Sequence, residues 1–314
     1  MTASTVALLP YSYIVGQRAL REALELAYVA PSIGGVLITG ERGTAKSTTV
    51  RAFCRMVYDG RLPVTLPLNA TDDRVLGGWN VDALMRGEPQ RLPGLLEQAN
   101  GGVLYIDEVN LLDDHLVDII LDVASTGFLV VQREGLDLPE VPVSFTLVGT
   151  MNPEEGGLRP QLLDRFGMVV PVSAEKGTAR REEILLTVLR FERESVEDGS
   201  AWIAEGRERD GRWFGRLVAA RARCAAVEVP VPMVRLCAQI AEDFGAAGHR
   251  GESVMARAAQ ARAALNERKE VTAEDVASVA PFAVAHRRPE AAYGDGIDWT
   301  PEDTARLSEI IAAG

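Results

Sequence analysis

Cysteine and histidine are scarce in this sequence. Of its 314 residues only three are cysteines, Cys54, Cys224 and Cys237, and no two of them form a C-x-x-C pair. An odd, scattered set of thiols argues against disulfides and structural zinc, and it is typical of proteins in a reducing compartment. The three histidines are scattered as well, so the sequence offers no histidine cluster for a metal site.

Long apolar runs and an excess of basic residues are also missing. No stretch approaches the roughly 20 uninterrupted apolar residues of a membrane span, and the N-terminus lacks the basic and apolar regions of a signal peptide. The formal net charge of −12 argues against a surface that coats nucleic acid. We therefore predict a soluble cytoplasmic protein with no membrane span and no nucleic-acid partner.

What remains is an ordinary globular composition with one strong local signal. With 47% hydrophobic residues, the chain has enough apolar mass for about two domains. The signal is residues 40–47, GERGTAKS, which follow an apolar run and open a segment with helical spacing. Strand, tight loop and helix in that order are the context of a phosphate-binding P-loop. The nucleotide-binding residues predicted here are Gly40, Gly43, Thr44, Ala45, Lys46, Ser47 and Thr48.

Each part of this loop has a predicted role. Glycines let backbone N–H groups turn inward, and the helix N-terminus adds partial positive charge. Lys46 would reach the β- and γ-phosphates of ATP, and the hydroxyl of Ser47 would hold Mg²⁺. Ala45 stands where the motif usually has glycine. We expect this departure to be mild, provided that the residue has a helical φ.

Residues just upstream of the loop are candidates for an adenine pocket. Ile14, Val15 and Gly16 precede an amphipathic segment, residues 18–29, that Pro31 ends. Val15 and Gly16 would then line the nucleotide site. The alternative, a helix packed on the sheet edge without ligand contact, stays open at this point.

A second buried strand ends in two carboxylates. Residues 102–108 read GVLYIDE, which is the Walker B pattern of four apolar residues followed by Asp-Glu. Asp107 would bind Mg²⁺, and Glu108 would polarise the attacking water. Strands often end in acids, so the pattern gains its weight from following a P-loop at this distance.

The next apolar strand, residues 145–150, leads to Asn152. Ligands of parallel sheets gather at the carboxyl ends of strands, so Asn152 would sense the γ-phosphate. The short helix over residues 158–166 then carries Arg159 and Arg165. These arginines are either plain surface charges or the source of the arginine that ring ATPases supply to a neighbour's γ-phosphate.

Two segments leave the nucleotide-binding domain, and a helical region follows it. The insert 69–99 contains Trp79 beside two glycines, read either as an exposed aromatic on a mobile arm or as a side chain folded onto the surface. Residues 128–143 are expected to form a β-hairpin with a charged tip. From residue 174 strand signals stop, and helices are predicted at 178–194, 213–227, 232–244, 253–269 and 273–285.

Taken together, these residues resemble the AAA+ ATPase subunit of magnesium chelatase and its MoxR-like relatives. The resemblance spans roughly residues 11–288 and is strongest at 105–118, at 149–156 and at 158–167, LRPQLLDRFG. It implies an α/β fold, with a P-loop AAA+ domain built on a parallel sheet and a smaller all-α lid domain. It also implies Asn152 as sensor 1, Arg165 as the arginine finger and Arg250 as sensor 2.

The resemblance further sets domain boundaries and partners. We expect a nucleotide-binding domain at 1–175, a helical linker at 176–225, the lid at 226–290 and an acidic tail at 291–314. Members of this family use ATP and Mg²⁺ and form hexameric rings. They work with a subunit carrying a von Willebrand factor A domain and with a large tetrapyrrole-binding subunit.

Three functions are consistent with these features. The first is the ATP-hydrolysing motor of a chelatase-type complex, which drives insertion of Mg²⁺ or Co²⁺ into a tetrapyrrole through partner subunits. The second is a MoxR-like chaperone that remodels a von Willebrand factor A domain partner. A nucleic-acid motor is the third, but the acidic balance and a hairpin tip whose basic residue is Arg133 alone weigh against it.

Overall fold

The centre of the structure is a parallel sheet of five short strands. The computed structural model describes residues 7–86, 88, 90–130, 140–196, 199–293 and 297–313. The strand order is β2-β5-β8-β1-β9, and the bounds are Val64–Leu66 (β2), Val103–Ile106 (β5), Thr146–Met151 (β8), Val36–Thr39 (β1) and Met168–Pro171 (β9). Strands β1 and β5 are buried along their whole length, as parallel strands covered on both faces must be.

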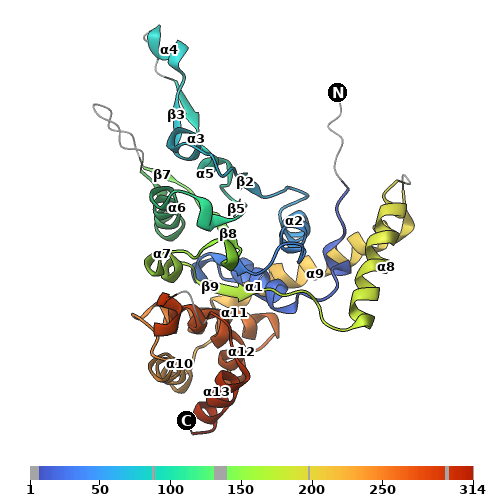
Figure 1. The fold of residues 1–314 in the computed structure, drawn as a ribbon, viewed down its shortest axis with the longest axis vertical. Helices are drawn as coiled ribbons and strands as arrows, with labels where there is room; N and C mark the ends of the chain where they lie inside the picture. Colours follow the sequence, from blue (N-terminus) through green and yellow to red (C-terminus); the bar gives the residue numbers. More distant parts are fainter. Residues whose placement is uncertain are drawn as a thin grey trace.

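Helices cover both faces of this sheet (Figure 1). The described helices before the lid are α1 (Arg18–Val29), α2 (Lys46–Val57), α3 (Asp72–Leu76), α4 (Val81–Met85), α5 (Leu95–Gln98), α6 (Asp114–Thr126), α7 (Pro160–Arg165), α8 (Thr178–Glu194) and α9 (Ala201–Cys224). Short 3-10 turns lie at Tyr11–Tyr13, Pro31–Ile33, Val109–Leu111, Pro153–Glu155, Ala285–Arg287 and Pro289–Tyr293. Alternate residues of a strand point to opposite faces, so Val36 and Ile38 join the core around α1 and α2, whereas Leu37 joins the core around α6 and α7.

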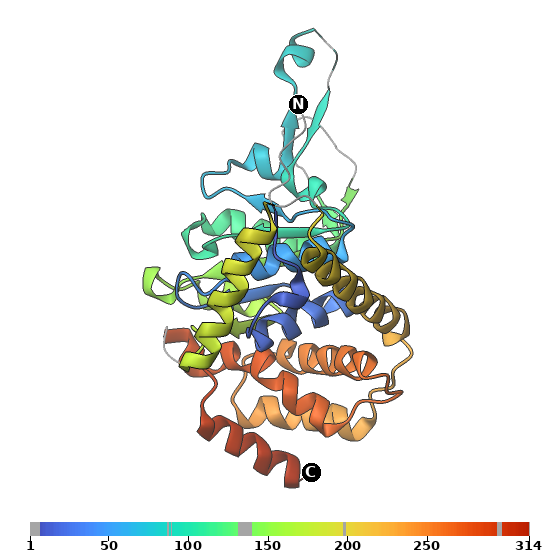
Figure 2. The ribbon, with the colours of Figure 1, turned by 90° about the vertical axis from the view of Figure 1, so that its right-hand side faces the viewer.

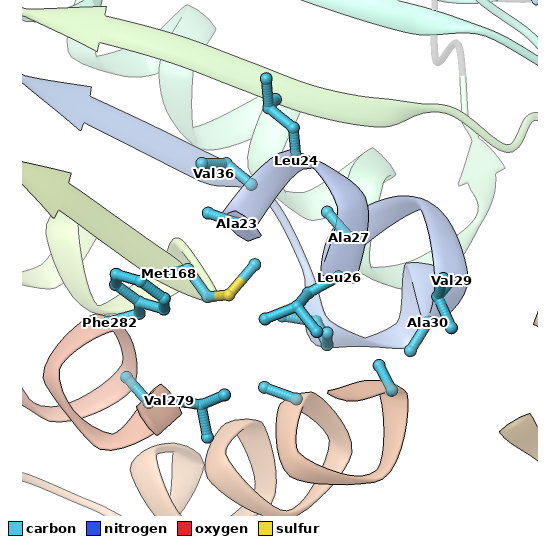
Figure 3. Close-up of a cluster of buried hydrophobic side chains, with 14 of the residues drawn as sticks. Ala23, Leu24, Leu26, Ala27, Val29, Ala30, Val36, Met168, Val279 and Phe282 are labelled. Carbon is cyan, nitrogen blue, oxygen red and sulfur yellow. The ribbon is translucent and has the colours of Figure 1, made fainter. Parts of the chain in front are cut away.

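Helix α1 lies between the sheet and the C-terminal helices. Figure 3 shows Ala23, Leu26 and Ala27 of α1 among Met168 of β9 and Phe282 of α12 (Ala273–Val284). Residues 23–29 of α1 are all buried. The helix predicted as amphipathic is thus enclosed on nearly every side along its second half, because helices of two domains pack against it.

The C-terminal helices α10 (Val231–Asp243), α11 (Arg250–Leu265) and α12 form the lid, and α13 (Pro301–Ala313) packs against α10 and α12. Trp299, just before α13, lies with its ring centroid 4.9 Å from that of Phe244. Arg288 and Asp303 form an ion pair of 2.9 Å across the same junction. The parallel sheet and the helical lid confirm the predicted fold class, and the tail helix lies against the lid.

Helix α9 differs from its prediction. Residues 198–212 were expected to be polar and irregular because of their glycines, with a helix only from residue 213. Instead one helix runs from Ala201 to Cys224. At Gly206 a Cβ would lie 2.6 Å from the ring of Tyr13 and 2.7 Å from Pro10. The glycine therefore lets the N-terminal segment pack directly on α9, and this packing offsets the intrinsic cost of glycine in a helix.

Two arms leave the sheet on the side opposite the lid (Figure 2). In the first, strands β3 (Gly77–Trp79) and β4 (Arg91–Pro93) pair antiparallel and carry α4 at the tip. In the second, β6 (Phe128–Leu129) pairs with β7 (Val141–Pro142); the rest of the predicted hairpin, residues 131–139, lies outside the described residues. The stretch around Trp79 predicted as a flexible tip is thus a strand at the base of its arm.

Among the described residues, no helix is both long enough and apolar enough to cross a membrane.

Candidate functional site

Three adjacent strands bring the predicted nucleotide-binding residues to one edge of the sheet. Strand β1 leads into the P-loop, β5 into Asp107 and Glu108, and β8 into Asn152. The order β5-β8-β1 places these strand ends side by side, and the backbone N–H of Gly40 donates to the carbonyl of Met151 at 3.1 Å. Asn152 is 6% exposed. The sequence-predicted P-loop, Walker B and sensor residues are therefore brought together.

Lys46 lies at the first position of α2 and turns back over the loop. Its ammonium group donates to the carbonyl of Glu41 at 2.8 Å and to the carbonyl of Gly40. Partial burial lowers the pKa of Lys46 from its usual range, while Asp107 and Glu108 act in the opposite direction. The positive charge thus faces the two carboxylates across the site, where a phosphate chain would lie between them.

The backbone at Ala45 corrects one expectation. A helical φ was the condition for treating the Ala45 departure as mild, but Ala45 has φ +61° and ψ 22°, in the left-handed region. This conformation costs an L-residue roughly 1–2 kcal/mol, a cost that glycine avoids. The loop therefore keeps the shape that glycine would give it and holds an alanine under backbone strain.

This strain predicts the effect of a single substitution. Ala45→Gly should raise the free energy of unfolding of the nucleotide-binding domain by about 1 kcal/mol, or about 2–4 °C in melting midpoint. Gly43→Ala is the matched control: Gly43 has φ +78°, and a Cβ there would meet nothing within 4 Å. It should lower the midpoint by strain alone. Thermal melts followed by circular dichroism test both, and an unchanged Ala45→Gly midpoint would contradict the strain argument.

Tyr105 and Thr150 connect the Walker B residues to the loop. The Tyr105 hydroxyl lies 2.9 Å from Oγ of Ser47 and donates to Asp107 Oδ1 at 3.1 Å. Thr150 donates to the same Asp107 oxygen at 2.7 Å and accepts from the backbone N–H of Glu108 at 3.0 Å. Burial raises the pKa of Tyr105 to about 12. The tyrosine therefore stays a neutral hydroxyl that holds Asp107 in place.

The oxygens at this point fit a Mg²⁺ ion. A hydroxyl (Ser47) and a carboxylate (Asp107) converge on one phenol group, and oxygen ligands of this kind suit Mg²⁺, which is commonly held by one or two protein oxygens together with phosphates and waters. When bound, the ion would neutralise charge on the phosphate oxygens. Among the described residues, no group of three or more His, Cys, Asp or Glu side chains could hold a metal by itself.

Glu108 has a left-handed backbone with φ +56°. Its carboxylate pairs with Arg42 of the loop at 2.9 Å, and the same Arg42 nitrogen contacts Glu155 at 2.5 Å. Strained backbone often marks functional positions. Here it aims the second Walker B carboxylate at the loop.

A cavity of about 260 Å³ adjoins the P-loop. Ile14 and Val15 line it together with Thr44, Ala45 and Thr48. The side chain of Gln17 donates to the Thr44 carbonyl at 2.9 Å. Helix α8 forms the far wall through Ile184 and Val188. The cavity is mainly apolar, which suits a nucleobase and favours the first of the two readings left open above.

Gly16 does not line this cavity. A Cβ on Gly16 would lie 2.0 Å from Oε1 of Glu175, and Gly16 has φ +74°. The carboxylate of Glu175 accepts from the backbone N–H of Gln17 at 3.0 Å. Gly16 therefore acts by letting the chain turn close to Glu175, beside the pocket that Val15 contacts.

The sequence matches two family models and several curated proteins. The models are an AAA domain of the dynein-related subfamily at residues 35–166 and an AAA lid domain at residues 234–310. The magnesium-chelatase 38 kDa subunit of Cereibacter sphaeroides is 40% identical over 310 residues, covering 88% of this chain and 91% of that protein. The chain belongs to the magnesium-chelatase family of AAA ATPases.

Other relatives agree with this assignment. An uncharacterized protein of Mycobacterium tuberculosis is 44% identical over 303 residues, and this chain spans 47% of its length. A cryo-EM-based structure of the complex between magnesium-chelatase subunits BchI and BchD matches at 34% identity with a TM-score of 0.50, covering 96% of this chain. The recognition made from the sequence motifs is thereby confirmed.

The two predicted arginines of this AAA ATPase lie at the other edge of the sheet. Arg165 and Arg250 line one cavity of about 290 Å³ together with Ile33 and Gly34. Gly34 precedes β1, and the P-loop follows it. Because β1 spans four residues, or about 13 Å, this cavity and the chain's own P-loop are separated by a strand length.

Carboxylates hold both arginines in place. Arg165 pairs with Asp118 of α6 at 3.0 Å, and Arg250 reaches the carboxylate and the carbonyl of Asp164 at 3.3 and 3.1 Å. The lid arginine and the α7 arginine therefore belong to one surface. The sequence predicted both residues, but it gave no sign that they lie side by side, away from Lys46.

Proposed function

We propose that this protein hydrolyses ATP at sites formed between copies of itself in a ring, and that it is the motor subunit of a chelatase-type complex. One observation carries the proposal. Lys46, Ser47, Asp107, Glu108 and Asn152 share one edge of the sheet, while Arg165 and Arg250 share a cavity at the opposite edge. Only a second copy can bring such arginines to this P-loop, which supports a ring, and we propose a hexamer.

The residues suggest a division of roles within each site. The P-loop amides and Lys46 would bind the β- and γ-phosphates, and the apolar cavity beside Val15 would hold the base. Glu108 would act as general base toward the attacking water, with Asn152 orienting it. The neighbour's Arg165 would stabilise charge on the transferred phosphoryl group. We propose ATP as substrate and Mg²⁺, held by Ser47 and Asp107, as cofactor.

The work of hydrolysis would be delivered to partner proteins. Among the described residues no second cluster of metal-binding side chains exists, so this chain would power insertion of Mg²⁺ (or Co²⁺) into a tetrapyrrole held by another subunit. We propose a partner with a von Willebrand factor A domain and a large tetrapyrrole-binding subunit, all in the cytoplasm. The magnesium-chelatase names of relatives near 40% identity support this assignment.

Reconstitution tests the proposal. The purified chain, the von Willebrand factor A domain partner and the tetrapyrrole-binding subunit are mixed with ATP, Mg²⁺ and a porphyrin, and the metalloporphyrin is followed by its absorption. We expect insertion only in the complete mixture and only with ATP. Insertion by this chain alone, or without hydrolysis, would contradict the motor assignment.

One observation favours a second candidate function. The relative from Mycobacterium tuberculosis at 44% identity is about twice as long as the matched region, so the same ATPase module also occurs within a larger protein. A MoxR-like chaperone that remodels a von Willebrand factor A domain partner is the corresponding alternative. Partner-stimulated ATPase activity without any metal insertion in the complete mixture would favour it.

The arm with β3 and β4 is a candidate contact for such a partner. Met85, in the tip helix α4, is 83% exposed, and Trp79 at the base is only partly buried. Below the tip, the backbone N–H of Asn80 donates to the Gln90 carbonyl at 2.9 Å, and their side chains bond at 3.0 Å. The arm can therefore be cut at this pair without disturbing the strands.

We expect the arm to be needed for coupling and dispensable for hydrolysis. Replacing residues 81–89 by Asn-Gly gives a two-residue hairpin turn between Asn80 and Gln90. This variant and Trp79→Ala should keep basal ATP hydrolysis and lose partner-dependent activity. Pull-downs with ATP, with ADP and without nucleotide measure partner binding, which must differ between nucleotide states for coupling to occur. If both variants keep every partner-dependent activity, the arm is not the coupling element.

A further inference from the structure

The cavity that contains Arg165 and Arg250 holds a third arginine. Arg257 of α11 lines the same space of about 290 Å³. It lies seven residues after Arg250, and two residues seven apart lie on one face of a helix. Three guanidinium groups from α7 and α11 thus face one cavity, with Asp122 as the carboxylate among its lining residues.

Arg257 differs from the other two arginines in its partners. Arg165 and Arg250 are paired with Asp118 and Asp164. Arg257 is exposed and donates to the Ser32 carbonyl at 2.6 Å. Within the described part of the chain, no carboxylate lies within ion-pair distance of Arg257. A single neutral carbonyl uses one of its five N–H donors, so most of its fork stays available to a ligand.

The charge of this cavity indicates the kind of ligand. Three positive charges against one acidic lining residue repel one another, and an anion between them would remove that repulsion. Guanidinium groups are suited to phosphate because their paired N–H donors match its oxygens. The chain's own P-loop lies a strand length away, so a triphosphate at this cavity would belong to another molecule.

We propose that Arg257 is a third phosphate-binding residue that this subunit contributes to the ATP site of its neighbour, alongside Arg165 and Arg250. The inference rests on the proposed function, in which the site is completed by a second copy. Arg257 contacts the neighbour's triphosphate and strengthens the binding of ATP. Because it has no carboxylate partner to leave, it binds phosphate without first breaking an ion pair.

Arg257→Gln in the full-length protein tests this. Losing one charge-assisted contact to phosphate should raise KM for ATP by about 10- to 100-fold. Arg257→Lys keeps a cation and should recover part of the loss. Arg235→Gln is the matched control, because Arg235 is an exposed lid arginine on α10 that lines a different cavity; its KM should equal that of wild type. Thermal melts show whether loss of the Ser32 contact disturbs the fold.

Mixed rings distinguish action on a neighbour from any structural role. In a mixture of Arg257→Gln and Lys46→Ala proteins, some interfaces combine an intact P-loop with intact arginines, so a phase with wild-type KM should return. An unchanged KM in Arg257→Gln would overturn the inference, and so would a mixture without that phase. The Arg165→Ala and Lys46→Ala mixture serves as reference: if it recovers activity while Arg257→Gln behaves as wild type, only the role of Arg257 is wrong. If the reference itself stays inactive in mixed rings, the proposed function fails as well.

Discussion

Glu108→Gln should bind Mg·ATP with nearly the affinity of wild type and hydrolyse it about 10²–10⁴ times more slowly. Glutamine keeps the size of the side chain and can still accept from Arg42, which lies 2.9 Å from the carboxylate. It cannot take a proton from water. The P-loop, and the Asp107 network through Tyr105 and Thr150, are left intact by this change.

Two further variants separate binding from hydrolysis. Lys46→Ala should bind ATP poorly, because it removes the cation that faces both carboxylates across the site. Glu155→Gln is the control for Glu108→Gln, since Glu155 pairs with the same nitrogen of Arg42 at 2.5 Å but is not the predicted base. It should turn over ATP at close to the wild-type rate. Nucleotide affinity by fluorescence titration and turnover by phosphate release measure all three; wild-type turnover in Glu108→Gln would refute the assignment of the general base.

The sequence predicts the convergence of the site because the argument depends only on topology. Apolar runs that end in Gly40, Asp107 and Asn152 must meet if they are parallel neighbours, and the order β5-β8-β1 makes them so. The bridging hydroxyls were missed. Tyr105 lies two residues before Asp107, and that spacing puts both side chains on one face of the strand. This signal was available, whereas the contact with Thr150 depends on the register between β5 and β8.

Other features could not be predicted because they depend on contacts between distant segments. Arg250 meets Asp164 across 86 positions of sequence, so its place follows from how the lid packs on α7. Helix α9 continues through Gly206 because Pro10 and Tyr13 pack there, and local propensity contains no trace of that contact. The φ of Ala45 is set by the path of the loop, which overrides the preference of its residue.

Arg165→Ala should lower ATP hydrolysis by about 10³–10⁵, the typical effect of losing an arginine finger, or roughly 4–7 kcal/mol of barrier. The fold should be almost unaffected, because the substitution breaks only the partly exposed ion pair with Asp118, and such pairs contribute about 0–1 kcal/mol. Arg159→Ala is the matched control: it breaks the ion pair of 2.6 Å with Asp114 on the same two helices and should keep its activity.

Mixing Arg165→Ala with Lys46→Ala shows whether the finger acts on a neighbour. Each protein alone is expected to be nearly inactive. In a mixed ring, an Arg165→Ala subunit supplies an intact P-loop and a Lys46→Ala subunit supplies the intact arginine, so part of the activity should return. Differently tagged subunits that co-purify establish that mixed rings form. Recovery requires that Arg165 reach across the interface, as its position a strand length from its own P-loop indicates. An inactive mixture, despite mixed rings, would mean that each chain completes its own site by a movement of α7 past β1.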